Sequence, residues 1–317
     1  MLEDFGTAAS PVFSTEGNQS TRRRTPHLAA LAARGTTFQR AYCQAPICNP
    51  SRTSFLTSRR PTTTQVFDND DESARALAML PTLIDFVRDA APEAAVGCAG
   101  DGKIFHVSCD QQARKLTYGE SELLRNASLD ALAERRVRAA VSSAHGTPAP
   151  TRALVQRTLE GGRYSCANAN DPKCTQRVQT RDQHRATVGL KMLALYARVR
   201  RRFFLAVGLS STHVDGHRIC MPAAYRAEGG ARKVTADEPL PIAPSRSREH
   251  HPPLVTWPNW DLTRFDVGLR WQREVIGQYY ACAAHVDAQI GALLGGGAYA
   301  GAMGRGGGRR SSSCSDE

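Results

Sequence analysis

The sequence lacks several patterns that would place a protein in a class at once. No apolar run is long enough to cross a bilayer. The first residues, Met1-Leu2-Glu3-Asp4, are acidic where a secretory signal peptide has basic residues followed by an apolar stretch. No Cys-x-x-Cys pair occurs, and no basic helical stretch carries interleaved aromatic residues. Taken literally, these absences predict a cytosolic chain without a membrane span or a nucleic-acid-binding helix.

The composition nevertheless indicates a folded core. Of 317 residues, 41% are hydrophobic, which excludes a disordered protein and suffices for one large α/β domain or two small ones. The net charge of +11 would permit binding to a polyanion. Much of this charge lies in short arginine clusters, which we interpret as solvated surface, so that no nucleic-acid partner is expected. The clusters are Arg22–Arg24, Arg135 and Arg136, Arg200–Arg202, and Arg309 and Arg310.

The cysteines are too scattered for a compact disulfide scaffold. They are nine, at positions 43, 48, 98, 109, 166, 174, 220, 282 and 314. Cys166 and Cys174, with His184 downstream, leave two interpretations open: a metal site, whose spacing fits no strong zinc pattern, or a disulfide across a short loop. An odd number of cysteines is natural if one is chemically converted.

The most informative segment is Cys48-Asn49-Pro50-Ser51-Arg52. Pro50 suits the first turn of a helix, which places Cys48 at a helix N-terminus, where free amides and the helix dipole attract anions. Arg52 adds a planar fork of donors that binds an oxyanion through two hydrogen bonds. The segment therefore predicts a nucleophile facing an anion pocket, with a buried cysteine before an ordinary helix as the alternative.

The apolar pattern predicts helices that alternate with strands, and therefore an α/β fold with a mixed or parallel sheet between helices. In the helix at 81–88, we expect Leu83, Phe86 and Val87 to face inward. Active sites of such folds lie at the carboxyl ends of strands, here in the loop at Gly100–Lys103 and the loop after Gly208. The predicted helices are 25–35, 81–88, 182–201 and 271–294, and the predicted strands are 36–42, 94–97 and 203–208.

Two further segments carry candidate site residues. Lys103 and His106 lie three residues apart, so that an ammonium and an imidazole can face one pocket. His213 follows the apolar run Phe203–Gly208 in a loop. Taken alone, each of these residues is also consistent with an ordinary exposed side chain.

Together these segments resemble the type I, formylglycine-dependent sulfatases, and most of all their iduronate-2-sulfatase-like branch. The resemblance lies in four places. The first is the helix that begins with Thr-Pro and ends with Gly, at 25–35, and the second is Cys-x-Pro-Ser-Arg at 48–52. The second motif is followed by Leu56-Thr57-Ser58-Arg59, in which Ser58 stands in place of the usual Gly. The third is Gly102-Lys103-Ile104-Phe105-His106, and the fourth is the strand and loop that end at His213.

The resemblance implies a role for each site residue. Cys48 would be oxidised to formylglycine, whose hydrate attacks sulfate esters. Arg52 and Lys103 would bind the sulfate, and His106 would contact the nucleophile or the ester oxygen. His213 would protonate the leaving alcohol or bind the sulfate.

A calcium ion is the cofactor that the resemblance implies. Glu3 and Asp4 stand where the family has an Asp-Asp pair, and with Cys48 they would hold one ion. The strand that precedes this pair in the family is missing, so we expect Glu3-Asp4 to hang from a free terminus. No Asp-His-Gly segment follows the helix at 271–294, so the second half of the ion's site is missing too.

The resemblance also implies an alkaline-phosphatase-like α/β fold, here incomplete. We expect residues 1–294 to be part of a sulfatase N-terminal catalytic domain, with a variable insertion at 113–160. The Gly-, Arg- and Ser-rich residues 295–317 are predicted to be a disordered tail. On this interpretation the chain is a fragment, truncated at both ends.

The predicted function is that of a sulfuric-ester hydrolase acting on a sulfated carbohydrate or a small sulfate ester. Its expected partners include a formylglycine-generating enzyme, with no nucleic acid and no membrane span. The complete protein would be secreted or lysosome-like. The alternative is a catalytically inactive fragment that binds sulfated ligands or acts as a basic interaction protein.

Overall fold

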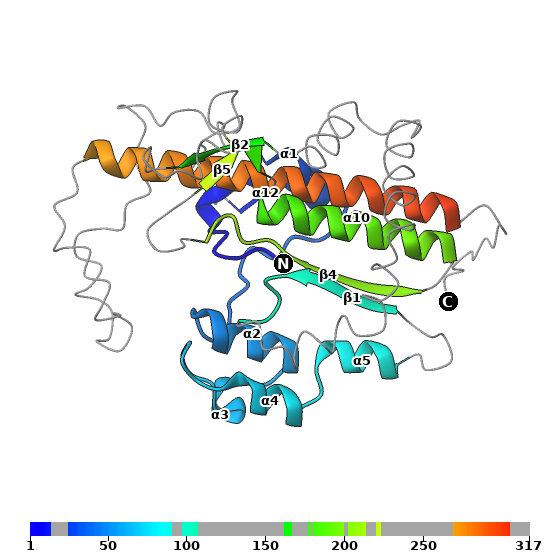
Figure 1. The fold of residues 1–317 in the computed structure, drawn as a ribbon. Coiled ribbons are helices and arrows are strands. Elements are labelled where there is room, and N and C mark those ends of the chain that lie inside the picture. The colour runs from blue at the N-terminus through cyan, green and yellow to red at the C-terminus, as the bar shows by residue number, and fades with distance from the viewer. Residues whose placement is uncertain are drawn as a thin grey trace, which may run out of the picture.

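A small parallel sheet lies between two layers of helices in the computed structural model (Figure 1). Strand β1 (Gly97–Gly102) pairs with β4 (Phe203–Gly208), in register from Gly97 opposite Phe203 to Gly102 opposite Gly208. On one side lie α10 (Arg181–Val199) and α12 (Leu269–Gly304). On the other lie α2 (Cys48–Thr57), α3 (Pro61–Thr64), α4 (Ser73–Met79) and α5 (Leu83–Asp89). The structure describes residues 1–13, 25–90, 97–106, 162–166, 177–178, 180–199, 202–213, 220–222 and 269–304.

Side chains that alternate along β4 connect the two layers. Phe204 and Ala206 pack against a cluster on the α2 side, whereas Leu205, between them, packs against Met192 and Tyr196 of α10. This is the two-sided packing expected of a strand that helices cover on both faces. The cluster on the α2 side is formed by Leu56, Leu77, Ile84 and Ile104.

The N-terminal residues extend this sheet, which corrects the prediction that Glu3-Asp4 hang from a free terminus. Leu2 forms a parallel bridge with Leu209, directly after β4. The amide of Glu3 donates to the Leu209 carbonyl at 3.0 Å, and the amide of Leu209 donates to the Met1 carbonyl at 2.9 Å. These backbone bonds fix Glu3 at the end of the sheet.

The remaining described elements lie around the two helical layers. Two short 3-10 helices, η1 (Thr7–Ala9) and η2 (Pro11–Phe13), precede α1 (Pro26–Ala32). A separate antiparallel sheet has the strand order β3-β2-β5, formed by β2 (Gly162–Cys166), β3 (Arg177–Val178) and β5 (Cys220–Pro222). Among the described helices, none combines the length and the apolar character that crossing a bilayer requires.

Several local predictions were wrong. Residues 36–42 form no strand, and Phe38 and Tyr42 are exposed. The predicted strand at 94–97 is observed at Gly97–Gly102, so that the predicted loop glycines lie within it. In α5 the inward residue is Ile84, whereas Leu83 and Phe86 are exposed.

The predicted C-terminal tail begins later than expected, and two other predictions fall on residues that the structure does not describe. Helix α12 continues to Gly304, past Gly295, where the tail was predicted to begin. The alanines at 298, 300 and 302 favour a helix and offset the glycines there. The insertion at 113–160 and residues 305–317 lie outside the described residues, as does Cys174, so the predicted domain division and the Cys166–Cys174 pairing stay predictions.

Candidate active site

Cys48 is the first residue of α2, and Ile47 precedes it in an extended conformation. The start of the helix is fixed by Asn49. Its amide donates to Asn69 Oδ1 at 2.9 Å, and its side-chain Nδ2 donates to the carbonyls of Asp68 and Asp71 at 3.2 and 2.8 Å. The prediction that Cys48 lies at a helix N-terminus is confirmed.

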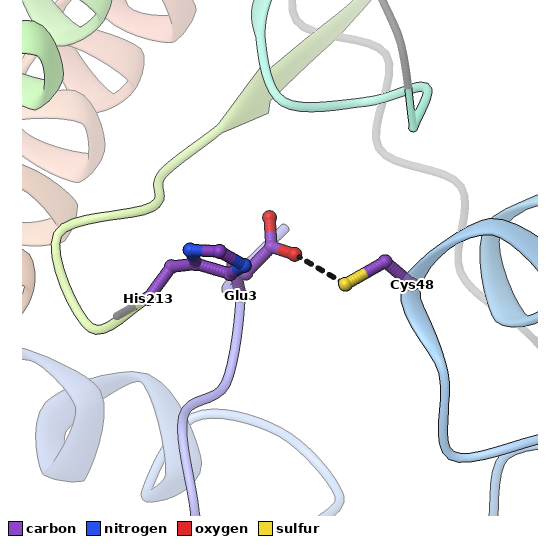
Figure 2. A group of neighbouring side chains, drawn as sticks. All are labelled: Glu3, Cys48 and His213. Atoms are coloured by element: carbon purple, nitrogen blue, oxygen red, sulfur yellow. Dashed lines mark hydrogen bonds between the residues drawn. The ribbon is translucent and has the colours of Figure 1, made fainter. Parts of the chain in front are cut away.

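The carboxylate of Glu3 lies at the centre of the site. Its Oε1 accepts from the Cys48 thiol at 3.3 Å, as Figure 2 shows, and from Lys103 Nζ at 2.8 Å. Its Oε2 accepts from Arg52 Nη2 at 2.6 Å. Burial favours the neutral acid, but the hydrogen bond from Lys103 and the charges of Arg52 and Lys103 outweigh it, so that the pKa of Glu3 is lowered. Glu3 is therefore a buried anion between two cations.

Arg52 connects the helix to the loop after β1. Its Nη1 donates to the carbonyls of Lys103 and Ile104 at 2.5 and 3.1 Å. Its Nε is buried and has no hydrogen-bond partner among the described residues. The guanidinium that was predicted to grip an oxyanion thus holds Glu3 and a loop, with one donor left unpaired.

Two glycines position Lys103. Gly102, at a φ of 88°, ends β1 in a left-handed conformation that favours glycine. The Lys103 amide donates to the Gly208 carbonyl at 3.1 Å. A Cβ on Gly208 would lie 2.4 Å from the Lys103 carbonyl carbon, closer than atoms pack. The end of β4 therefore needs a glycine for the lysine loop to approach.

His106 follows in the same loop with its ring half-buried. Its Nδ1 is buried without a hydrogen-bond partner among the described residues. Burial lowers the pKa of His106, and the charges of Lys103 and Arg52 lower it further. The imidazole is therefore held neutral, as a proton acceptor requires.

His213 reaches the site on a loop that Asp182 fixes. This buried carboxylate, at the start of α10, accepts from the amides of Ser210 and Ser211 at 2.7 to 2.9 Å and from Arg185 at 2.8 Å. The hydroxyl of Thr212, the next residue, donates to the Glu3 carbonyl. The loop is thereby joined to both α10 and the N-terminal segment.

Asp4 lies at the exposed edge of this centre, beside His213. Its side chain is exposed, and its Oδ2 lies 3.9 Å from His213 Nε2. Tyr279 of α12 holds the backbone here, because its hydroxyl donates to the Asp4 carbonyl and accepts from the Gly6 amide, both at 2.7 Å. Burial raises the pKa of Tyr279, which keeps this hydroxyl protonated.

Glu3, Cys48 and Arg52 lie within a segment that known proteins share. Residues 1–90 match the family model described as Sulfatase. This segment resembles the sulfatases. A protein named sulfatase from Formosa agariphila is 32% identical over 114 residues, 33% of this chain and 20% of that protein.

Two other sulfatases match shorter segments. The human iduronate 2-sulfatase is 49% identical over 45 residues, which is 14% of this chain and 8% of that enzyme. The choline-sulfatase of Rhizobium meliloti is 35% identical over 86 residues, 27% and 15% of the two chains. The chain thus covers 20% or less of the length of these relatives.

The calcium ion expected for a sulfatase does not fit the donors that the described residues present near Cys48. Calcium takes six to eight oxygen ligands. Near Cys48, the described residues offer one buried carboxylate, Glu3, which two cations already bind, and the exposed Asp4. The group of metal-ligating atoms that does converge is Glu3, Cys48 and His213, all within 4.8 Å of one another. Two of these three donors are sulfur and nitrogen.

The sulfatase motifs therefore converge, but not in the predicted arrangement. Cys48, Arg52, Lys103 and His213 gather around Glu3, with His106 beside Lys103 in the loop. Asp4 does not join the metal-ligating group. Sequence reasoning missed Asp182, Thr212 and Tyr279. Only Asp182 had a local signal, since an acidic residue in a first helical turn often accepts from free amides.

Proposed function

We propose that this chain carries the nucleophile of a sulfuric-ester hydrolase, with Cys48 as the residue converted to formylglycine. The supporting observation is the position of Cys48 at the start of α2, with Glu3 at 3.3 Å and Lys103, Arg52 and His213 around that carboxylate. Glu3, Cys48 and Arg52 lie within residues 1–90, which match the family model described as Sulfatase. Because the chain covers 20% or less of the relatives' lengths, the activity of the whole protein is part of the proposal.

The residues around position 48 suit the transfer of a sulfuryl group. Formylglycine at this position would supply, as its hydrate, the hydroxyl that attacks sulfur. Lys103 and Arg52 stabilise the negative charge on the sulfate oxygens. Lys103 is one-fifth exposed and reaches a ligand most readily, whereas Arg52 offers its unpaired Nε.

Two histidines suit the proton transfers. His213, half-buried at the edge of the site, donates a proton to the alcohol oxygen as it leaves. His106, held neutral, accepts a proton from the hydroxyl at position 48 when sulfate is released and the aldehyde returns. The two histidines thereby divide the acid and base roles.

The finer parts of the function are proposals as well. We assign the substrate to sulfated carbohydrates or small sulfate esters, in keeping with relatives named for iduronate, choline and ulvan. Conversion of Cys48 would replace a sulfur donor by oxygen, but a calcium ion at Glu3, Asp4 and this oxygen would still need further ligands, because calcium takes six to eight oxygens. A mixed sheet of the alkaline-phosphatase-like kind and a secreted or lysosome-like location complete the proposal.

Mass spectrometry and an activity assay test this function. The chain is coexpressed with a formylglycine-generating enzyme and digested, and we expect the peptide that contains Cys48 to show conversion of thiol to aldehyde. Cys43, exposed and five residues earlier, is the internal control and should stay a thiol. Hydrolysis of an aryl sulfate by the converted protein should be abolished by Cys48→Ala and retained in Cys43→Ala.

Two outcomes would count against the proposal. A Cys48 peptide that remains a thiol after coexpression would remove the nucleophile. Conversion without turnover, together with saturable binding of a sulfated carbohydrate that Lys103→Ala weakens, would favour the alternative of a protein that binds sulfated ligands.

A further inference from the structure

Three potential metal ligands meet from three separate segments of the chain. Glu3 comes from the N-terminal segment beside β4, Cys48 from the start of α2, and His213 from the loop after β4 (Figure 2). Their ligand atoms lie within 4.8 Å of one another, and Cys48 Sγ is 3.3 Å from Glu3 Oε1. Metal bonds of about 2.0 to 2.3 Å require ligand atoms some 3.3 to 3.8 Å apart. A small inward shift of His213, which is half-buried, closes the site.

The chemistry of these donors selects the metal. A thiolate, an imidazole and a carboxylate are ligands that zinc binds, and three protein ligands with a water in the fourth position is a common zinc geometry. Calcium and magnesium prefer oxygen and do not compete for sulfur. With the unconverted cysteine the site therefore favours zinc, whereas calcium is the ion expected for a sulfatase.

The surrounding charges are compatible with a divalent ion once the ion replaces Lys103 at Glu3 Oε1. Lys103 Nζ now lies 2.8 Å from Glu3 Oε1, and its side chain is one-fifth exposed, so it can move to solvent and leave this oxygen to the metal. Arg52 remains on Oε2 at 2.6 Å, in the way that hydrogen-bond donors orient a metal-bound carboxylate. The thiol releases its proton to solvent on binding, and two anionic ligands then balance the ion.

We propose that the chain with an unconverted Cys48 binds one zinc ion through Glu3, Cys48 and His213, in preference to calcium. The inference goes beyond the proposed function, because conversion of Cys48 removes the sulfur ligand. Zinc binding is measured on unconverted protein and turnover on converted protein, so that either can fail without the other.

Metal titration of the full chain tests the inference. The protein is produced without a formylglycine-generating enzyme and titrated with Zn²⁺ by calorimetry and with Co²⁺ by absorption spectroscopy. We expect wild-type protein to bind one more equivalent of zinc than Cys48→Ser, and to show a thiolate-to-cobalt band that Cys48→Ser lacks. A large excess of calcium should displace neither ion.

Matched variants separate this site from the chain's other cysteines and histidines. His213→Gln removes one ligand and should weaken zinc binding by more than about 100-fold, because loss of a partner behind a ligand alone costs about 10- to 100-fold. Cys43→Ser and His184→Gln, both at exposed positions, should bind zinc as wild type does. Circular dichroism of each variant confirms that it is folded.

Three results would overturn the proposal. The first is equal zinc binding by wild type and Cys48→Ser. The second is a cobalt band that persists unchanged in His213→Gln, which would exclude the imidazole as a ligand. The third is displacement of zinc by calcium, which would contradict the preference for sulfur and nitrogen donors.

Discussion

Ser58 shows how one side chain can oppose the conformation that its position requires. It ends α2 at a φ of 57°, in the left-handed region where glycine is favoured and where the sulfatase motif usually has glycine. A residue with a Cβ is destabilised there by about 1 to 2 kcal/mol. Serine in place of glycine at this position therefore lowers the local stability, and the rest of the fold offsets the strain.

Replacing Ser58 by glycine should stabilise the protein. We expect Ser58→Gly to raise the free energy of unfolding by about 1 kcal/mol, since the relief of strain outweighs the chain entropy that glycine adds to the unfolded state. Urea denaturation measures the change. Ser54→Gly, inside the same helix, is the control and should lower the free energy by about 0.5 kcal/mol. Equal effects of the two substitutions would contradict the argument.

At the residue scale, local sequence singled out side chains that the fold brings together around Glu3, but not how they pair. Cys48 and Arg52 share a helix, and their motif identified both. The ion pairs of Glu3 with Arg52 and Lys103 join residues far apart in the chain, so no local pattern contains them. The resemblance predicted Glu3 as a calcium ligand, whereas the folded chain gives its carboxylate to two cations.

At the scale of elements, the start of α10 controls the loop that carries His213. Asp182 is fully buried and accepts from the amides of Ser210 and Ser211 and from Arg185. The carboxylate of Asp182 thus joins the start of α10 to the loop that follows β4. Because these donors are partly buried, loss of their acceptor leaves them incompletely hydrogen-bonded.

We therefore expect Asp182→Asn to lower the free energy of unfolding by about 2 kcal/mol or more. Hydrogen exchange at the amides of Ser210 and Ser211 should become faster, because an asparagine has one acceptor oxygen in place of two. Urea denaturation and exchange measured by mass spectrometry test both effects. His184→Gln, exposed on the same helix turn, should change neither. Unaltered exchange at Ser210 and Ser211 would show that Asp182 does not fix the loop.

Sequence periodicity predicted the long elements better than the short ones. The helices at 182–201 and 271–294 and the strand at 203–208 were confirmed within a few residues at most boundaries, since each has a long apolar pattern. Strand β1 is rich in glycine, and only its pairing with β4 makes it a strand. In α5 the choice between Ile84 and its neighbours depends on where the sheet lies, which the helix's own sequence does not contain.

Across the whole molecule, α12 holds the N-terminal part of the chain. Tyr279 binds the backbone at Asp4 and Gly6, and Asp287 accepts from the amides of His27 and Leu28 at the start of α1, at 3.1 and 2.7 Å. Gly291 lets the His27 ring approach, since a Cβ there would lie 2.5 Å from it. The far C-terminal helix thus supports the segment that presents Glu3.

The contact between Asp287 and α1 makes the stability of the molecule depend on pH. Burial raises the pKa of Asp287 from 3.8 to about 6, although the amides of Leu28 and His27 oppose the shift. Between these two values the folded chain binds more protons than the unfolded chain, so the contribution of Asp287 to stability is largest at low pH and falls as the pH rises through 6. A shift of this size corresponds to about 3 kcal/mol.

Comparison with Asp287→Asn isolates this contribution, because asparagine has the shape of the protonated acid and does not titrate. The free energy of unfolding of wild type, relative to that of Asp287→Asn, should fall by up to about 3 kcal/mol between pH 4 and pH 7. Urea denaturation of both proteins across this range gives the difference directly. A difference that is constant with pH, or that grows in favour of wild type, would show that the amides of α1 keep Asp287 ionised. The helix N-terminus would then outweigh burial in setting this charge.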